Sequence, residues 1–140
     1  MNLYTLEVHT PYRLFFKDSV VAVVLRLIDG EIGIYAGHSP FTAPVCTGIL
    51  KIQDAQGQWR EAFTTEGILE VTHHKTVLLV DAAEWPEEID CQRARLAKTR
   101  AQERLAAMNL HIERESAKAL LKRAEFRLKV SELHRQGGKV

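Results

Sequence analysis

The first 86 residues alternate between apolar and polar positions in short runs that turn residues separate. Alternation with a period of two predicts strands that bury one face. Asp29-Gly30 and the segment 54–57 are turn signals for two hairpins. No helical period interrupts the series, so the pattern predicts an antiparallel β-sandwich or a flattened barrel. The predicted strands cover residues 3–9, 12–16, 19–28, 31–35, 48–53, 59–64, 68–72 and 75–80.

The pattern changes after Pro86. All eight glycines and all four prolines lie outside residues 87–136, where apolar residues recur every three or four positions. Two helices are predicted, with Pro86 in the first turn of the first helix and Asn109 as the stop between them. Their apolar stripes are Ala94, Ala97, Ala101, Leu105 and Met108, then Ala117, Leu121, Ala124 and Leu128.

These elements predict an α+β protein in two modules. Residues 1–86 form the β-sandwich, residues 87–136 form an antiparallel hairpin of two helices, and residues 137–140 form a flexible tail. Because the helical stripes are narrow and rich in alanine, the hairpin buries little area and is marginally stable alone. It therefore needs another surface or a ligand to fix its conformation.

Charge divides along the same boundary. Residues 1–86 carry six Lys/Arg against ten Asp/Glu, a net charge of −4, and residues 87–136 carry twelve against eight, a net charge of +4. A basic helical module indicates an acidic partner or a polyanionic ligand, and a solvated charged face is the alternative.

Candidate catalytic chemistry is sparse. His73-His74 has no third metal ligand at useful spacing and is better explained as a turn at the end of a strand. No serine or cysteine lies in a nucleophile motif, so no catalytic residue and no metal site are predicted. Cys46 and Cys91 lack ligand spacing, which favours a reducing compartment, and no signal peptide or spanning segment is visible. A soluble intracellular chain is expected.

Arginines on the predicted helices suggest a ligand. Arg123 and Arg127 are four residues apart and share one helix face, and Arg93 follows Asp90 by three residues. Guanidinium groups from two helices would form a phosphate clamp, and Asp90 could accept a hydrogen bond from an adenine or a ribose. The alternative is an ordinary surface pair between Asp90 and Arg93.

Several segments, in order along the chain, resemble one family, the ε subunit of bacterial and chloroplast rotary ATP synthases. DGEIGIYAGHSP (29–40) resembles that family's DGEIGILPGHAP, and EGILEV (66–71) resembles its GGFLEV. TVLLVDAAE (76–84) is similar to VTVLADxAE, and residues 119–130 resemble ALxRAxxRLxV. The departures are Tyr35-Ala36 in place of Leu-Pro, Glu66 in place of glycine, and Pro86 where alanine is usual.

The resemblance implies a sandwich of about ten strands, a helical hairpin and a non-catalytic role. Such subunits belong to the central rotor stalk of the proton-translocating enzyme, bind the γ subunit and the c-ring, and are peripheral on the cytoplasmic face of the membrane. The hairpin is a mobile brake on ATP hydrolysis. When extended it meets acidic loops of the β subunits, and when folded it releases the enzyme. Glu31 and His38 would then lie near the γ subunit and the c-ring.

Some family members bind ATP in the folded hairpin through an I/L-D-x-x-R-A motif, an acid six residues before its Asp, and two arginines on the second helix. No cofactor is required, and ATP would act as a regulatory ligand. The resemblance implies the site residues Glu84, Ile89, Asp90, Arg93, Ala94, Arg100, Arg123 and Arg127.

Two other functional classes are alternatives to the rotor stalk. A nucleic-acid binder would explain the basic helices, but the sandwich is acidic and lacks exposed aromatics interleaved with Lys and Arg. No nucleic-acid partner is therefore expected. A small hydrolase would need a nucleophile, a base and an orienting group, which the spacing does not supply.

Overall fold

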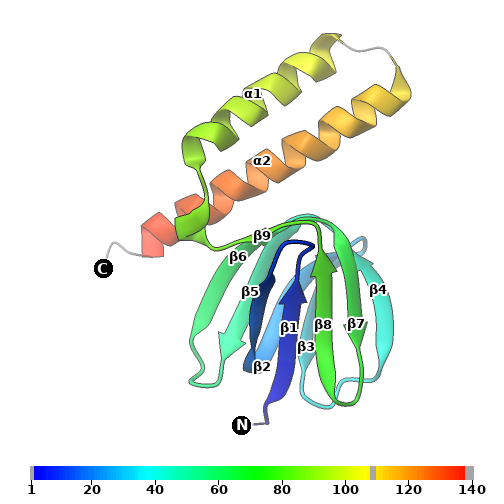
Figure 1. Ribbon diagram of the computed structural model, residues 1–140, viewed down its shortest axis with the longest axis vertical. Coiled ribbons are helices and arrows are strands. Elements are labelled where there is room, and N and C mark those ends of the chain that lie inside the picture. The colour runs from blue at the N-terminus through cyan, green and yellow to red at the C-terminus, as the bar shows by residue number, and fades with distance from the viewer. Residues whose placement is uncertain (1, 108–109, 138–140) are drawn as a thin grey trace. The chain divides into compact units, whose positions relative to one another are not determined.

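A computed structural model describes residues 2–107 and 110–137. The chain divides into two compact units, Met1–Trp85 and Pro86–Val140. The first unit is a β-sandwich and the second is a pair of helices (Figure 1). The predicted α+β class is confirmed.

The sandwich contains nine strands among the described residues, where about ten were expected. All but one of the strand pairs are antiparallel. The strands are β1 (Tyr4–His9), β2 (Leu14–Leu27), β3 (Gly30–Tyr35), β4 (Phe41–Val45), β5 (Gly48–Asp54), β6 (Trp59–Thr64), β7 (Gly67–Val71), β8 (Lys75–Val80) and β9 (Ala83–Glu84).

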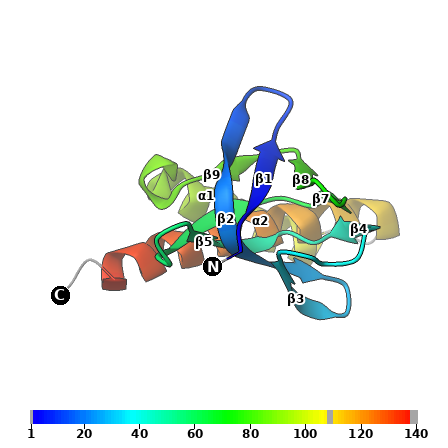
Figure 2. The ribbon, with the colours of Figure 1, turned by 90° about the horizontal axis from the view of Figure 1, so that it is seen from below.

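The long strand β2 joins the two layers. Its first half pairs with β1, and its second half pairs with β3 on one side and β5 on the other. The pairing shifts register between Val20 and Ala22, and such a bulge bends a strand. One layer is therefore β4-β7-β8-β1-β2 and the other is β3-β2-β5-β6-β9. Figure 2 shows the β1–β2 hairpin and β3 on opposite sides of the sandwich.

The core lies between these layers. Alternate residues of each strand point inward, as in β7, where Leu69 and Val71 are buried while Ile68 and Glu70 are exposed. The two-residue period read from the sequence is therefore the period of burial. The largest fully buried side chains include Phe63, Leu6, Ile34, Leu50, Ile52, Leu69 and Leu78.

The exception to antiparallel pairing is β1 with β8, which run parallel. The Glu7 carboxylate on β1 is 2.8 Å from Nε2 of His9 on the same strand and 3.1 Å from Nζ of Lys75 on β8. The hydrogen bond from His9, and then that from Lys75, hold the pKa of Glu7 below its usual value. The Glu7 side chain is largely buried, and its carboxylate stays charged because His9 and Lys75 both donate hydrogen bonds to it.

One strand prediction was wrong and one strand was missed. Residues 12–16 were read as a separate strand, but Leu14–Phe16 is the beginning of β2, since β2 runs unbroken through Lys17-Asp18-Ser19. Strand β4 was not predicted because Pro40 and Pro44 flank and interrupt its pattern. Proline is tolerated there because β4 is at the edge of its layer and pairs only with β7.

Trp85 is the last residue of the sandwich unit, and its side chain packs against that unit. Its ring stacks on Phe15 with 4.5 Å between centroids and meets Phe16 edge-on at 6.2 Å. The Arg60 guanidinium carbon lies 3.8 Å above its centre, a cation–π contact. These contacts anchor the chain to the sandwich at the residue before Pro86.

The helical unit begins with a short 3-10 turn, η1 (Pro86–Glu88), followed by α1 (Cys91–Ala107) and α2 (His111–Gly137). Pro86 was expected in the first turn of the long helix, and this prediction was wrong. Asp90 caps α1 instead, since its Oδ1 accepts a hydrogen bond from the Arg93 backbone N–H at 3.0 Å. The predicted stop at Asn109, the stripe residue Met108 and tail residues 138–140 lie outside the described residues.

The two helices are antiparallel (Figure 1). At one end Cys91 Sγ is 2.8 Å from Ser131 Oγ, and at the other Arg114 donates to the Leu105 carbonyl at 2.5 Å. The seam between them is made of small residues, and its buried members include Ala94, Ala101, Ala117 and Ala124. Ala97, predicted in the stripe, is exposed.

Candidate functional site

Seven of the eight residues predicted to bind ATP belong to the helical unit. Arg93 and Arg100 are both exposed on α1, and each comes directly before a seam alanine. Arg123, half-buried on α2, also comes directly before a seam alanine, and Arg127 follows one turn later. Successive helical residues are about 100° apart, so in antiparallel helices the residues that precede seam positions lie on the same flank. The four guanidinium groups therefore share one side of the hairpin, which we call the arginine flank.

Asp90, Ile89 and Ala94 occupy the start of α1. Asp90 is exposed and uses one carboxylate oxygen as the helix cap. Ile89 is 8% exposed and Ala94 is 4% exposed. Ala94 allows the helices to approach closely, while Asp90 retains a second oxygen that could accept from a ligand.

Glu84 lies in the other unit. It is half-buried in β9, where it pairs with Phe63, and it precedes the anchored Trp85. The eight predicted residues are therefore distributed over both units, with the four arginines gathered on one.

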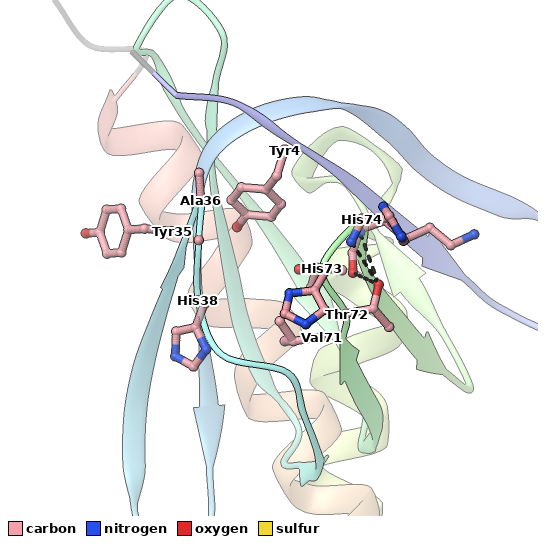
Figure 3. Close-up of a pocket in the computed structure, with 11 residues that line it drawn as sticks. Tyr4, Tyr35, Ala36, His38, Val71, Thr72, His73 and His74 are labelled. Carbon is pink, nitrogen blue, oxygen red and sulfur yellow. Dashed lines mark hydrogen bonds between the residues drawn. The ribbon is translucent and has the colours of Figure 1, made fainter.

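A second candidate site is the loop after β3. His38 is half-buried, its Nδ1 is 2.9 Å from the Ser39 carbonyl, and its ring lies 5.1 Å from that of Phe41. This loop and the β7–β8 turn line a pocket of about 50 Å³ (Figure 3). In Figure 3 Tyr4 and His73 point toward the space between the two loops and Tyr35 points away. A space this small has room for about one water molecule, so the loop is a surface rather than a small-molecule site.

The histidine pair lies in a turn, as predicted. Thr72 accepts backbone hydrogen bonds from His74 and Lys75 at 3.3 and 3.2 Å and donates to the Lys75 carbonyl at 3.0 Å. These bonds close the connection between β7 and β8. Over the ranges 2–107 and 110–137, no three His, Cys, Asp or Glu side chains are grouped as metal ligands.

Glu31, the other predicted interface residue, is exposed near the start of β3 and pairs with Arg26. His38 follows the other end of that strand. The span from Glu31 to Tyr35 is about 13 Å at the usual rise per strand residue. The two residues therefore mark two separate points on the sandwich surface.

A row of exposed side chains crosses the outer face of one layer. Direct pairing aligns Pro44 with Ile68, Ile68 with Leu79, Leu79 with His9, and His9 with Leu14. Ile68, Leu79 and Leu14 are 51%, 49% and 51% exposed. We call this set the apolar row. Sequence reasoning missed it because alternation shows which residues share a face of one strand, whereas a row across strands depends on register.

Tyr4 supports the inner side of the same layer. Its hydroxyl donates to the Ile34 carbonyl at 2.6 Å, and burial raises the pKa of the phenol. This bond links β1 to β3 across the sandwich.

In the part of the chain that the structure describes, no helix is both long enough and apolar enough to span a bilayer.

Comparison with known proteins covers both units. Residues 3–86 match the ATP synthase delta/epsilon chain β-sandwich domain, and residues 87–132 match the delta/epsilon chain long α-helix domain. The chain belongs to the ATP synthase epsilon-chain family. The epsilon chain is a non-catalytic subunit, so the prediction that the protein is not an enzyme is confirmed.

Relatives in this family extend over nearly the whole chain. The epsilon chain of Caldicellulosiruptor saccharolyticus is 51% identical over 137 residues, 98% of this chain and 99% of its own. That of Caldicellulosiruptor bescii is 50% identical over 136 residues, 97% and 98% of the two chains. A chain of the Euglena gracilis mitochondrial ATP synthase has a similar fold, with a TM-score of 0.69 and 20% identity over 96% of this chain and 81% of that one.

Proposed function

We propose that the protein is a rotor subunit of the central stalk, bound to the γ subunit and the c-ring of ATP synthase. In this role it couples rotation to ion flow without catalysing a reaction itself. The observation that carries the proposal is that both units belong to the epsilon-chain family along almost their full length. As part of that complex, the subunit would be peripheral on the cytoplasmic face of the membrane.

The sandwich supplies the docking surfaces. The apolar row offers exposed hydrophobic side chains on a regular sheet face, a feature that marks protein interfaces. Glu31 and the His38 loop add polar contacts at two other points. We assign Glu31 and His38 to contacts with the γ subunit and the c-ring.

The helical unit supplies regulation. It is a separate compact unit with a net charge of +4 over residues 87–136 and an alanine seam that buries little area. Because little area holds the hairpin together, a partner can compete for its surfaces. In the proposed inhibitory state the helices extend and meet acidic loops of the β subunits.

ATP would select the folded hairpin. The arginine flank gathers four guanidinium groups near Asp90, which uses one carboxylate oxygen as the helix cap and has its second oxygen available for a ligand. A ligand that binds only the folded state stabilises it by about 2.7 kcal/mol at a hundredfold excess over Kd. That free energy reverses a two-state balance that favours the extended hairpin by less than this amount, and depletion of ATP would release the hairpin.

Truncation tests the regulatory role. A chain that ends at Trp85 keeps β9 and the contacts of Trp85, so the sandwich should fold and still assemble. ATP hydrolysis by the assembled enzyme should then rise while coupling persists. Unchanged hydrolysis, under conditions where the full chain inhibits, would show that the hairpin is not the brake.

Calorimetric titration of the full chain with ATP tests the ligand. Arg123→Ala and Arg127→Ala should each weaken binding by about 1.5–3 kcal/mol, the range for a hydrogen bond to a charged group. Lys122→Ala removes an exposed cation on the same helix and is the matched control. No heat with millimolar ATP would remove the nucleotide from the proposal, and the rotor role would then rest on assembly alone.

A further inference from the structure

A groove runs along the helical unit, on the side opposite the arginine flank. It has a volume of about 520 Å³, which is within the usual range of small-molecule sites. Both helices contribute to its lining, which includes Arg95, Lys98, Thr99, Gln102, Leu128 and Arg135.

Helical geometry places this groove away from the predicted ATP residues. Arg95 and Gln102 come directly after the seam residues Ala94 and Ala101, whereas Arg93 and Arg100 come directly before them. With about 100° between successive residues, the two sets project to opposite sides of the seam. The groove shares no lining residue with the arginine flank.

Two of the three cations that line the groove, Arg95 and Lys98, have no ion pair among the residues that the structure describes. These two residues are one turn apart on α1. The one acid in the lining, Glu132, is paired with Arg135 and accepts a hydrogen bond from Gln136 at 3.4 Å. The groove therefore has an excess of positive charge on the α1 side.

The remaining lining defines what the cations can bind. The Thr99 hydroxyl donates to the Arg95 carbonyl at 3.1 Å, so its proton is already used. Gln102 adds an amide donor and half-buried Leu128 adds an apolar surface. Arginine and lysine side by side suit phosphate oxygens, because one offers a planar fork and the other a compact charge.

We propose that this groove binds a small anion with two linked phosphates, of the pyrophosphate type, between α1 and α2. Two linked anionic centres fit this arrangement because Arg95 and Lys98 lie on one helix and Arg135, which also contacts Glu132, lies on the other. A diphosphate bound to both helices stabilises their pairing. The diphosphate is free pyrophosphate or the tail of a nucleotide, and both present the same oxygens.

The test uses calorimetry and thermal unfolding of the full chain, with sodium pyrophosphate at millimolar concentration and ionic strength matched by sodium chloride. Pyrophosphate should bind and raise the Tm of the helical signal. Loss of one charged contact weakens binding about tenfold or more, so the double variant Arg95→Gln/Lys98→Gln should lose at least a hundredfold. The control variant Arg104→Gln/Lys122→Gln removes equal charge from exposed positions outside the groove and should bind normally.

Further arms separate the possible ligands and the two flanks. Orthophosphate has one anionic centre and should therefore bind at least tenfold more weakly than pyrophosphate. Arg123→Ala/Arg127→Ala should leave pyrophosphate binding intact, and ATP binding by that variant would identify a nucleotide tail as the ligand. Absence of heat with pyrophosphate, an equal loss in the control, or a loss only in the Arg123/Arg127 variant would each overturn the proposal. The Arg123/Arg127 variant separates the two places, because it lacks two of the four arginines of the arginine flank and keeps every lining residue of the groove.

Discussion

Replacing Asp90 with alanine, serine and asparagine would separate two roles of its carboxylate. One oxygen caps α1 through the Arg93 backbone N–H at 3.0 Å, and the other is proposed to read an adenine amino group. Alanine removes both roles. Serine keeps a capping oxygen but is too short to reach a base, and asparagine keeps the cap while removing the charge.

The expected magnitudes follow from the cap. Loss of an N-cap side chain costs about 1 kcal/mol, within a range of roughly 0.5–2. Loss of the negative charge at the helix N-terminus costs about 0.3–1 kcal/mol in addition. Asp90→Ala should therefore destabilise the helical unit by about 1–2 kcal/mol, while Asp90→Ser and Asp90→Asn should cost only the charge contribution. A difference of 1 kcal/mol changes the ratio of folded to unfolded hairpin about fivefold.

Two optical signals can resolve this difference, because both tryptophans, Trp59 and Trp85, belong to the sandwich unit. Denaturation followed by helical circular dichroism should shift for Asp90→Ala, while tryptophan fluorescence should not. In nucleotide titrations Asp90→Ala and Asp90→Ser should both lose the preference for ATP over GTP. Equal destabilisation by alanine and serine would refute the capping explanation, and wild-type discrimination by serine would refute base reading.

Three further predictions concern the sandwich. Glu31→Ala/His38→Ala should weaken binding to the γ subunit and c-ring while leaving the Tm of the isolated chain unchanged, because both side chains lie at the surface. Glu7→Gln should make stability fall less steeply below about pH 4.5. Because the pKa of Glu7 is lowered in the folded protein, its charged carboxylate stabilises the fold above the ordinary pKa of 4.5, and this stabilisation is lost as the pH falls through the folded-state pKa. Gly67→Ala should destabilise by about 1–3 kcal/mol or more, because an added Cβ would lie 1.9 Å from the Leu79 carbonyl oxygen.

Each of these has a contradicting result. Wild-type affinity in the Glu31/His38 variant would remove both residues from the interface. A parallel pH profile for Glu7→Gln, with Glu70→Gln on the exposed face as the control, would show that the His9 and Lys75 contacts do not hold the charge. A stable Gly67→Ala variant would mean that β7 and β8 can separate locally.

The two modules could be predicted from the sequence because each has its own period of burial. Strand β7 follows its expected repeat, and Ala94 and Ala101 lie at the helical seam as expected, although Ala97 between them is exposed. The edge strand β4 could not be predicted, since Pro44 is acceptable only when one side of a strand has no partner, and that depends on strand order. The start of α1 was misplaced by five residues because both Pro86 and Asp90 are favourable helix-start residues.

The candidate sites show the same division. Spacing along one helix predicted that Arg123 and Arg127 share a face, and the α2 geometry agrees. The apolar row and the Glu7–His9–Lys75 cluster depend on the register between strands far apart in sequence. Register is fixed by packing of the whole sandwich, so a local pattern does not contain it. The groove beside Lys98 needs the pairing of two helices for the same reason.

The anchoring of Trp85 has a mechanical consequence. Since stacking on Phe15 and the contact with Arg60 fix the chain at this residue, and the helical unit begins at Pro86, any reorientation of that unit must be absorbed at the junction of Trp85 and Pro86. That junction would act as a pivot, with the 17 residues of α1 as a lever beyond it. Such a lever is about 25 Å long, so a rotation of about 30° would carry its far end about 13 Å. A few backbone dihedrals beside one tryptophan would then set the reach of the whole hairpin.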